Sequence, residues 1–371
     1  MLITFLLLSG AVAYLVAGYP LLLLLRKRHP VRKKFTPRTV TILLAVRNGE
    51  AWLQEKLENL SELDYPPELV QIVVISDGSR DATEQIARSW NDRGVKLIVQ
   101  PGEGKSVALN AGIAEARSEI LLFTDVRQRF APDALKHLLA CFDDPRVGVV
   151  SGELMIVTGR THEEASVGLY WKYEKWIRMR LSEIDSILGA TGCIYAMRRE
   201  LAVAMPKGIL LDDVFLPLAA FFRGYRSILE PAAKAFDSPT SLDVEFRRKV
   251  RTQAGVYQLL YYFPELLGPK NRMWIDFVSH KFGRLLLPWL LVAMFAISFF
   301  LPGPWRAAAP MQAGFYLLAV SDRIIPDRSR FKRITSPTRT FVTLMIAAAC
   351  AISIVLVPAD RLWRVTAPRK D

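Results

Sequence analysis

Acidic side chains follow apolar runs at three separate points of the chain. Asp77 follows Val70–Ser76, Asp125 follows the run Glu119–Phe123 by way of Thr124, and the pair Asp212-Asp213 follows two leucines. A carboxylate at the end of a buried strand is costly unless water or a ligand solvates it, although an exposed turn would also place one there. The two adjacent carboxylates repel each other, which is expected to raise the pKa of one of them. This is typical of a general base, and a helix N-cap is the alternative.

Basic residues stand near glycines and on one helical stretch. Lys105 lies in Gly102-Glu103-Gly104-Lys105-Ser106, directly before a helical pattern. Glycines at a helix start with a lysine favour phosphate binding, although the P-loop spacing is absent. Farther on, Arg248 and Arg251 are three residues apart within Arg247–Arg251. They would share one side of a helix, either as a clamp for a diphosphate or as a basic face toward lipid.

Alternating strand and helix patterns surround these residues. Four β-branched, almost wholly apolar runs predict strands buried on both faces, and they occupy Thr39–Val46, Val70–Ser76, Val95–Val99 and Glu119–Phe123. Helical patterns lie between them at Ala51–Leu60, Ala82–Arg93 and Lys105–Ala116. Such alternation predicts an α/β fold with a doubly wound, Rossmann-like sheet. Ligands of such folds bind outside the carboxyl ends of the strands, which is where the acids stand.

The two ends of the chain are strongly apolar. Leu2–Leu25 has no charged side chain and is followed by Arg26-Lys27-Arg28, so we expect an uncleaved membrane helix with cytoplasmic chain after it. Leu285–Leu301 and Phe341–Val357 also suit membrane spans, while Met311–Ile325 is weaker because it contains Asp322 and Arg323. If all three span, the basic tail Arg361–Lys370 lies outside, against the positive-inside rule. One of them would then be interfacial or re-entrant, and the sequence leaves open which.

Composition agrees with a membrane protein. The chain has 371 residues, 51% hydrophobic side chains and a formal net charge of +13, and its mean hydropathy is +0.20. These values exclude a disordered chain. The basic excess suits anionic lipid or an anionic substrate, and a nucleic-acid partner is not expected. Three widely spaced cysteines, Cys141, Cys193 and Cys350, provide no disulfide framework, which fits a reducing compartment.

Seven short motifs follow one another in an order that resembles the membrane-bound family 2 glycosyltransferases. That group includes the catalytic subunits of cellulose, hyaluronan, chitin and poly-N-acetylglucosamine synthases, and ceramide glucosyltransferase. The resemblance runs from about Thr39 to about Tyr262, and each motif is weak alone. The motifs are AVRNGE, DGSRDAT, GKSVALNAG, FTDVR, GATGCIYAMRRE, LLDDVFLP and RRKVR.

The resemblance implies a cytoplasmic glycosyltransferase domain of the A type. It implies a nucleotide pocket lined by Ala45, Arg47 and Glu50. Asp77 would accept a hydrogen bond from the uracil ring of a UDP-sugar, and Lys105 would approach the nucleotide or its diphosphate.

The resemblance also assigns the reacting end of the pocket. Asp125 matches the first acid of the family's Asp-x-Asp motif, which implies Mg²⁺ or Mn²⁺. Asp213, beside Asp212, matches the family's general base, and Gly192 lies in the loop at the acceptor end. The cations that match the arginine motif, and that would bind the diphosphate, are Arg248 and Arg251.

Two departures from the family pattern affect what we expect. Arg127 stands where the second acid of Asp-x-Asp would contact the metal. It either replaces part of the metal's charge or points away from it. Thr252 stands where polymerising members have a tryptophan that stacks on the acceptor sugar, which makes a long polymer a weaker expectation.

We therefore expect three regions. Residues 1–25 form a membrane helix, and residues 26–282 form the cytoplasmic domain with interfacial helices toward its end. Residues 283–371 form a membrane region of about three apolar segments with a short basic tail. The expected activity is inverting transfer from a UDP-sugar to a polysaccharide or lipid-linked acceptor at a bacterial-type inner membrane, with or without a partner subunit. The alternatives are a single transfer to a polyprenyl or other lipid carrier, and an inactive nucleotide-binding membrane scaffold.

Overall fold

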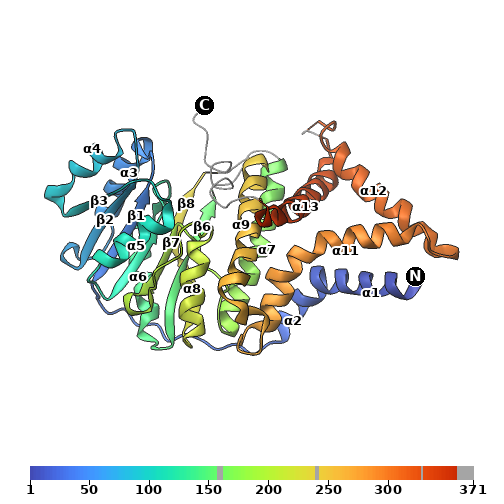
Figure 1. Cartoon of the computed structure of the whole chain (residues 1–371), viewed down its shortest axis with the longest axis horizontal. Helices are drawn as coiled ribbons and strands as arrows, with labels where there is room; N and C mark the ends of the chain where they lie inside the picture. Colours follow the sequence, from blue (N-terminus) through green and yellow to red (C-terminus); the bar gives the residue numbers. More distant parts are fainter. Residues whose placement is uncertain (157–161, 239–241, 327–328, 357–371) are drawn as a thin grey trace. The chain divides into compact units, whose positions relative to one another are not determined.

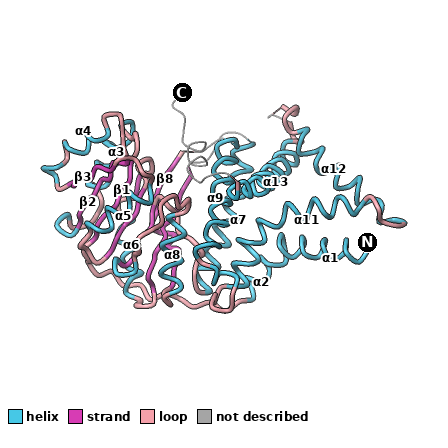
Figure 2. Tube along the Cα trace, in the orientation of Figure 1, coloured by secondary structure: helices cyan, strands magenta, loops and turns pink. Residues whose placement is uncertain are grey.

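The chain divides into two compact units. The computed structural model describes residues 1–156, 162–238, 242–326 and 329–356, so the basic tail Arg361–Lys370 lies outside the described residues. Unit 1 comprises Met1–Arg26, Thr158–Arg180 and Pro239–Asp371, and unit 2 comprises Lys27–Val157 and Leu181–Ser238. Figure 2 shows the magenta strands of unit 2 and the helices, in cyan, of which the described part of unit 1 is built.

The described residues of unit 2 form an eight-stranded sheet in the order β3-β2-β1-β4-β7-β6-β8-β5 (Figure 1). The strands are β1 (Val40–Val46), β2 (Val70–Asp77), β3 (Val95–Gln100), β4 (Ile120–Thr124), β5 (Arg129–Phe130), β6 (Val147–Ile156), β7 (Ile194–Arg198) and β8 (Arg226–Asp237). The helices between them are α3 (Glu50–Ser61), α4 (Thr83–Arg88), α5 (Lys105–Glu115), α6 (Ala134–Ala140) and α8 (Asp212–Phe222). This arrangement confirms the expected α/β class.

The sheet is mixed rather than wholly parallel. Strands β1 to β4 are parallel to their neighbours among themselves, as their apolar runs predict. β7 pairs antiparallel with both β4 and β6, and β5 pairs antiparallel with β8. β7 runs in the opposite direction to β4 and β6, so it enters the sheet at the end where those two strands leave it.

Helices cover both faces of the sheet. On one face, alternate residues of β1 such as Val40 and Ile42 join a core with Leu53 and Leu57 of α3. On the other face, Leu43 and Ile75 lie so close to Gly112 of α5 that a Cβ at Gly112 would come within 3.0 Å of both. This double coverage buries the strands on both sides, and it leaves their carboxyl ends as the open edge of the sheet.

The described part of unit 1 consists of helices and the turns and loops that connect them. Its helices are α1 (Leu2–Ala13), α2 (Tyr19–Leu25), most of α7 (His162–Ile184), α9 (Leu242–Tyr262), α10 (Trp274–Asp276), α11 (Gly283–Ser298), α12 (Ala308–Ser321) and α13 (Lys332–Cys350). Within this unit α1 packs against α11, and α13 packs against α9, α11 and α12.

Three stretches of the described chain are long and apolar enough to cross a membrane. They are Leu2–Leu25, Trp274–Ser298 and Lys332–Val355. The weak run Met311–Ile325 forms α12, which has 14 residues and is not among them. Its Asp322 is buried and accepts hydrogen bonds from Thr335 and Ser336 of α13, so the acid that weakened this run has polar partners inside the helical unit.

Candidate active site

The turn after β2 places Asp77 against the loop that begins α5. Asp77 is buried, and its Oδ1 accepts a hydrogen bond from the backbone N–H of Gly104 at 3.0 Å. The two loops touch closely, because a Cβ on Gly78 would lie 2.8 Å from the Cα of Gly102. Gly78 also has a φ of +67°, which favours glycine. The Asp-Gly turn and the Gly-x-Gly segment thus form one cradle at the carboxyl edge of the sheet.

The turn after β1 lies beside the turn after β2. Asn48 has a φ of +52° and its Oδ1 accepts from the N–H of Arg80 at 2.9 Å. Glu50, at the start of α3, accepts from the N–H of Ala82 at 3.0 Å. Ala45 and Glu50 are half-buried, whereas Arg47 is exposed. The predicted nucleotide-pocket residues therefore lie at the carboxyl ends of β1 and β2 and in the turn between β1 and α3, and the Arg47 side chain is exposed.

Lys105 joins acids from two distant motifs. Its Nζ donates to Asp125 Oδ1 at 3.0 Å and lies 3.2 Å from Asp212 Oδ2. The second contact is an ion pair without hydrogen-bond geometry, and Asp212 Oδ2 is buried without a hydrogen-bond partner among the described residues. The first residue of α5 thus connects the end of β4 to the start of α8. The three motifs that carry Lys105, Asp125 and Asp212 meet at one point.

The charges at this point balance one another in part. Burial opposes the charge of the Lys105 ammonium, but the carboxylates of Asp125, Asp212 and Asp213 raise its pKa above the ordinary value. Lys105 is therefore protonated at neutral pH. Its positive charge also offsets the repulsion between the paired acids, an effect that their adjacency in the sequence did not predict.

The loop that contains Gly189 and Gly192 lies against Asp213. The N–H of Ala190 donates to the main-chain oxygen of Asp213 at 2.7 Å. A Cβ at Gly192 would lie 2.9 Å from Asp213 Oδ2, and Gly192 is the site residue predicted from the same loop. Thr124 Oγ1 donates to Cys193 O at 3.0 Å, which ties this loop to the end of β4. The half-buried carboxylate of Asp213 therefore faces a loop with no side chain at the point of contact.

Arg127, in the place of the second acid, turns toward β8. Its Nη2 donates to Asp237 Oδ2 at 3.3 Å, and Gln128 Nε2 donates to the same oxygen at 2.6 Å. Asp237 was not recognised from the sequence, because it ends a strand, β8, that pairs with a segment more than a hundred residues earlier. Tyr195 was also missed. Its hydroxyl is buried without a hydrogen-bond partner among the described residues, and burial, together with the negative charges of Asp212, Asp213 and Asp125, raises its pKa.

The acids fit a divalent ion only in part. Asp125 has a side chain that is 41% exposed, so its carboxylate is accessible. In the described part of the chain no group of three or more His, Cys, Asp or Glu side chains is placed to hold a metal. Mg²⁺ is often bound by one or two carboxylates together with phosphate oxygens and water. The residues therefore fit an ion held by Asp125 with the rest of its ligands from a bound diphosphate.

The two predicted diphosphate cations belong to unit 1. Arg248 pairs with Glu245 at 2.8 Å, and its guanidinium lies 4.8 Å from the ring centroid of Trp171. Arg251 is on the same helix, α9. Thr252 Oγ1 donates back to Arg248 O at 2.8 Å, so this side chain is bound to its own helix. A diphosphate role for the two arginines stays a prediction.

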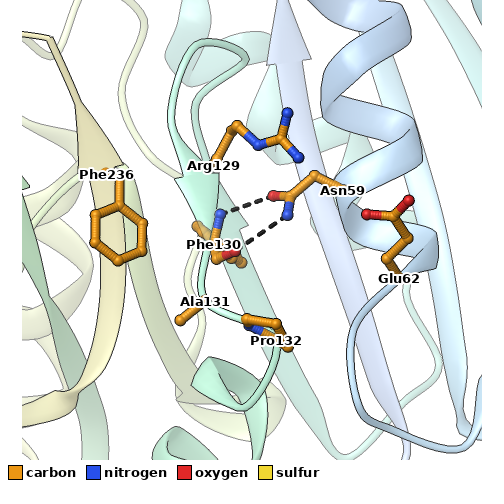
Figure 3. A pocket seen from close by; sticks show the side chains of 7 residues that line it. All are labelled: Asn59, Glu62, Arg129, Phe130, Ala131, Pro132 and Phe236. Carbon is orange, nitrogen blue, oxygen red and sulfur yellow. Dashed lines mark hydrogen bonds between the residues drawn. The ribbon is translucent and has the colours of Figure 1, made fainter.

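A cavity of about 420 Å³ lies beside β5 (Figure 3). Asn59 of α3 forms two hydrogen bonds with the backbone of Phe130, donating to its oxygen at 3.1 Å and accepting from its N–H at 2.7 Å. Glu62, Arg129 and Phe236 complete much of the lining, and none of the predicted site residues takes part. The cavity shows how α3 holds β5, the strand that directly follows Arg127 and Gln128.

Comparison with known proteins agrees with this geometry. Residues 41–204 match the model of the family described as "Glycosyl transferase family 2". The beta-monoglucosyldiacylglycerol synthase of Nostoc sp. is 25% identical over 248 residues, which are 63% of this chain and 52% of that protein. The poly-beta-1,6-N-acetyl-D-glucosamine synthase of Staphylococcus aureus is 25% identical over 236 residues, or 60% of this chain and 55% of that protein. The chain thus spans about half the length of these relatives.

A solved structure shares the fold over nearly the whole chain. The mannosyltransferase PcManGT from Pyrobaculum calidifontis, solved in complex with GDP-Man and Mn²⁺, superposes with a TM-score of 0.75. The alignment is 21% identical and covers 95% of this chain and 98% of that one. At this identity the likeness shows the fold. The family model, for its part, confirms the resemblance drawn from the seven motifs over residues 41–204, which form a glycosyl transferase family 2 domain.

Proposed function

We propose that this chain is a membrane-bound glycosyltransferase that moves a sugar from a UDP-sugar to a polysaccharide or lipid-linked acceptor. One observation carries the proposal, namely the meeting of Lys105 with Asp125 at 3.0 Å and with Asp212 at 3.2 Å. Sugar transfer needs a group that accepts a proton from the attacking hydroxyl and cations that stabilise the departing diphosphate. The carboxyl edge of the sheet brings both kinds of group together.

Asp213 acts as the general base in this proposal. Its carboxylate takes the proton of the acceptor hydroxyl while that oxygen bonds to the anomeric carbon and the bond to the diphosphate oxygen breaks. UDP leaves with the electron pair of that bond. A single displacement inverts the anomeric configuration, so no second carboxylate is needed as a nucleophile.

Cations stabilise the negative charge that develops on UDP as it leaves. Lys105 is protonated and lies beside the first acid, so it is placed to bind the diphosphate. A bound Mg²⁺ or Mn²⁺ would supply further positive charge at Asp125. The resemblance to the family assigns a diphosphate role to Arg248 and Arg251 as well. The nucleotide itself would be held by Ala45, Arg47, Glu50 and Asp77.

The acceptor is proposed only as a class. One relative is named as a diacylglycerol glycolipid synthase and another as a polysaccharide synthase. Thr252, bound back to its own helix, leaves the position of the stacking tryptophan without an aromatic ring. This favours transfer of a single sugar to a lipid carrier as the second candidate function.

Membrane attachment rests on the three apolar stretches. Many of their side chains are exposed in the protein alone, for example Leu7, Leu21 and Val292. Burying such surface in lipid is favourable by roughly 25 cal/mol per Å². We propose that these helices anchor the chain in a bacterial-type inner membrane and that the α/β domain faces the cytoplasm, with or without a partner subunit.

The deciding experiment is a donor panel with the full chain purified in detergent. UDP-glucose, UDP-galactose, UDP-N-acetylglucosamine and GDP-mannose are each incubated with a lipid extract, with Mg²⁺, Mn²⁺ or EDTA. We expect release of UDP and a labelled lipid or polymer product with one UDP-sugar. Release of GDP alone would correct the donor, and binding of nucleotide without any release would favour the inactive scaffold.

A further inference from the structure

Arg127 forms an ion pair with Asp237, the last residue of β8. Its Nη2 lies 3.3 Å from Asp237 Oδ2, and the Gln128 amide donates to that same oxygen at 2.6 Å. The side chain of Asp237 is 15% exposed and that of Arg127 is 41% exposed. The acid is thus nearly buried, while its cationic partner still reaches the surface of the site.

The backbone beneath this pair is fixed on two sides. Gln128 is buried, and its main-chain oxygen accepts a hydrogen bond from the buried Lys56 Nζ at 2.6 Å. Next along each strand, Arg129 is paired with Phe236 in the antiparallel ladder of β5 and β8. Extending this register by one residue places Gln128 opposite Asp237, and Arg127 is the next residue, so Asp237 lies within reach of both side chains.

The guanidinium has donors to spare. Arg127 makes one side-chain hydrogen bond, through Nη2, within the described part of the chain. Arginine presents five N–H donors in a planar fork that suits phosphate oxygens. A half-exposed ion pair is weak, because water screens the attraction between its charges. A doubly charged phosphate group could therefore accept hydrogen bonds from the other N–H groups of Arg127 while Nη2 still donates to Asp237.

We propose that Arg127 is a diphosphate-binding cation of this transferase and that Asp237 is the residue that positions it. Asp125 lies two positions before Arg127 on the same loop, so both would face the same end of a bound nucleoside diphosphate. A second acid at this position would help to bind a metal ion, and that ion would bring positive charge to the diphosphate. Arg127 supplies positive charge at the same position directly. The inference rests on the proposed function, because it presumes that a nucleoside diphosphate occupies the site.

One consequence separates this arrangement from a site that holds its donor through a metal alone. The protein's own cation would keep part of the affinity for the second phosphate when divalent ions are removed. UDP should then bind the full chain in EDTA more tightly than UMP. We expect a preference of about tenfold, which is the scale of one charge-assisted contact of about 1.4 kcal/mol.

The test is titration calorimetry of UDP and UMP on the full chain in detergent with EDTA. The variants are Arg127→Met, Asp237→Asn and the double variant, and Arg129→Met is the matched control. Arg129 lies two residues on and forms its ion pair with Glu55, away from Asp237. Arg127→Met should reduce the preference for UDP over UMP several-fold and leave the part that Lys105 provides, and Arg129→Met should keep the full preference.

The double variant tests whether Asp237 acts through Arg127. Asp237→Asn should reduce the preference several-fold in the native background and leave it unchanged in Arg127→Met, as expected for two coupled residues. An equal effect of Asp237→Asn in both backgrounds would overturn the positioning role. Equal binding of UDP and UMP by the native chain in EDTA would overturn the inference while sugar transfer with metal still stands. If neither nucleotide binds even with Mn²⁺, the proposed function fails with it.

Discussion

Gly192 and Asp213 touch so closely that there is no room for a side chain between them. A Cβ on Gly192 would lie 2.9 Å from Asp213 Oδ2 and 3.4 Å from its Cγ. The 2.9 Å distance is shorter than real Cβ contacts, so one partner has to move. The carboxylate is the end of a side chain, and it would rotate more readily than the loop backbone would shift.

Gly192→Ala should therefore damage catalysis more than folding. Displacing a general base by about 1 Å can cost on the order of 100-fold in rate, so we expect turnover to slow by roughly one to two orders of magnitude with little change in donor KM. The measurement is steady-state transfer together with thermal unfolding. Gly314→Ala is the control, because a Cβ at Gly314 of α12 meets nothing within 4 Å. Native turnover in Gly192→Ala would show that Asp213 does not need its present position.

Asp213→Asn should abolish transfer and leave nucleotide binding nearly intact. The amide has the shape of the carboxylate but cannot accept the hydroxyl proton, and loss of general-base catalysis costs roughly 10²- to 10⁴-fold. Asp212→Asn is the informative comparison, since it removes the neighbouring carboxylate that pairs with Lys105 at 3.2 Å. We expect a smaller loss of turnover there. The opposite ranking of the two variants would assign the base to Asp212.

The sheet could be predicted where its order follows from local pattern. The four apolar runs of the first half became β1 to β4 with ends shifted by at most one residue, for example Val70–Asp77 for the predicted Val70–Ser76. Buried parallel strands have this continuous apolar signature. The order of the second half of the sheet does not follow from local pattern. β7 enters antiparallel between β4 and β6, and such long-range pairing leaves no mark in the local sequence.

The site divides in the same way. Lys105 begins a predicted helix and Asp125 follows a predicted strand, so their meeting followed from the geometry of a parallel sheet. Asp212 was brought to the same site only by the family resemblance. Asp237 did not stand out, because its importance depends on the register between β5 and β8. Arg127 left two interpretations open from the sequence, and only its contact with Asp237 shows that the guanidinium turns toward β8.

Lys56 should make the stability of the chain depend on pH. It is 1% exposed, and burial lowers its pKa to about 7, although Cys193 and Asp125 act in the opposite direction. The unfolded chain, with an ordinary lysine pKa near 10.5, binds the proton that the folded chain gives up. Between about pH 7 and pH 10.5 the unfolded state holds more protons, so the free energy of unfolding rises with pH across that window.

The measurement compares melting temperatures of the native chain and Lys56→Met from pH 6 to pH 9. The free energy of unfolding of the native chain should increase relative to that of the variant as pH rises, by up to a few kcal/mol. Gln128 O loses its donor in the variant, which costs about 1–3 kcal/mol at every pH and does not alter the trend. Lys136→Met is the control, because Lys136 pairs with the exposed Asp64 at the surface. A constant difference between native chain and Lys56→Met would rule out this titration.

Arg284→Met should destabilise unit 1 by leaving a buried acid without its nearest cation. Arg284 Nη1 lies 2.6 Å from Glu174 Oε2, and the Glu174 side chain is 9% exposed. Burial opposes ionisation of Glu174, but Arg284 and His280 hold its pKa well below the ordinary value. Removing one partner of a buried pair typically costs about 3–5 kcal/mol. Thermal unfolding of the full chain in detergent should show a clearly lower melting temperature.

The double variant Glu174→Gln with Arg284→Met separates charge from packing. If the loss in Arg284→Met comes from an uncompensated carboxylate, the uncharged glutamine should restore a large part of the melting temperature. His280 Nε2 lies 2.7 Å from Arg284 Nη2 and 3.6 Å from Glu174 Oε1, so it keeps a polar neighbour in the double variant. Arg323→Met, at an exposed position after α12, should leave the melting temperature unchanged. If the double variant melts no higher than Arg284→Met, the arginine stabilises unit 1 through its packing and not through its charge.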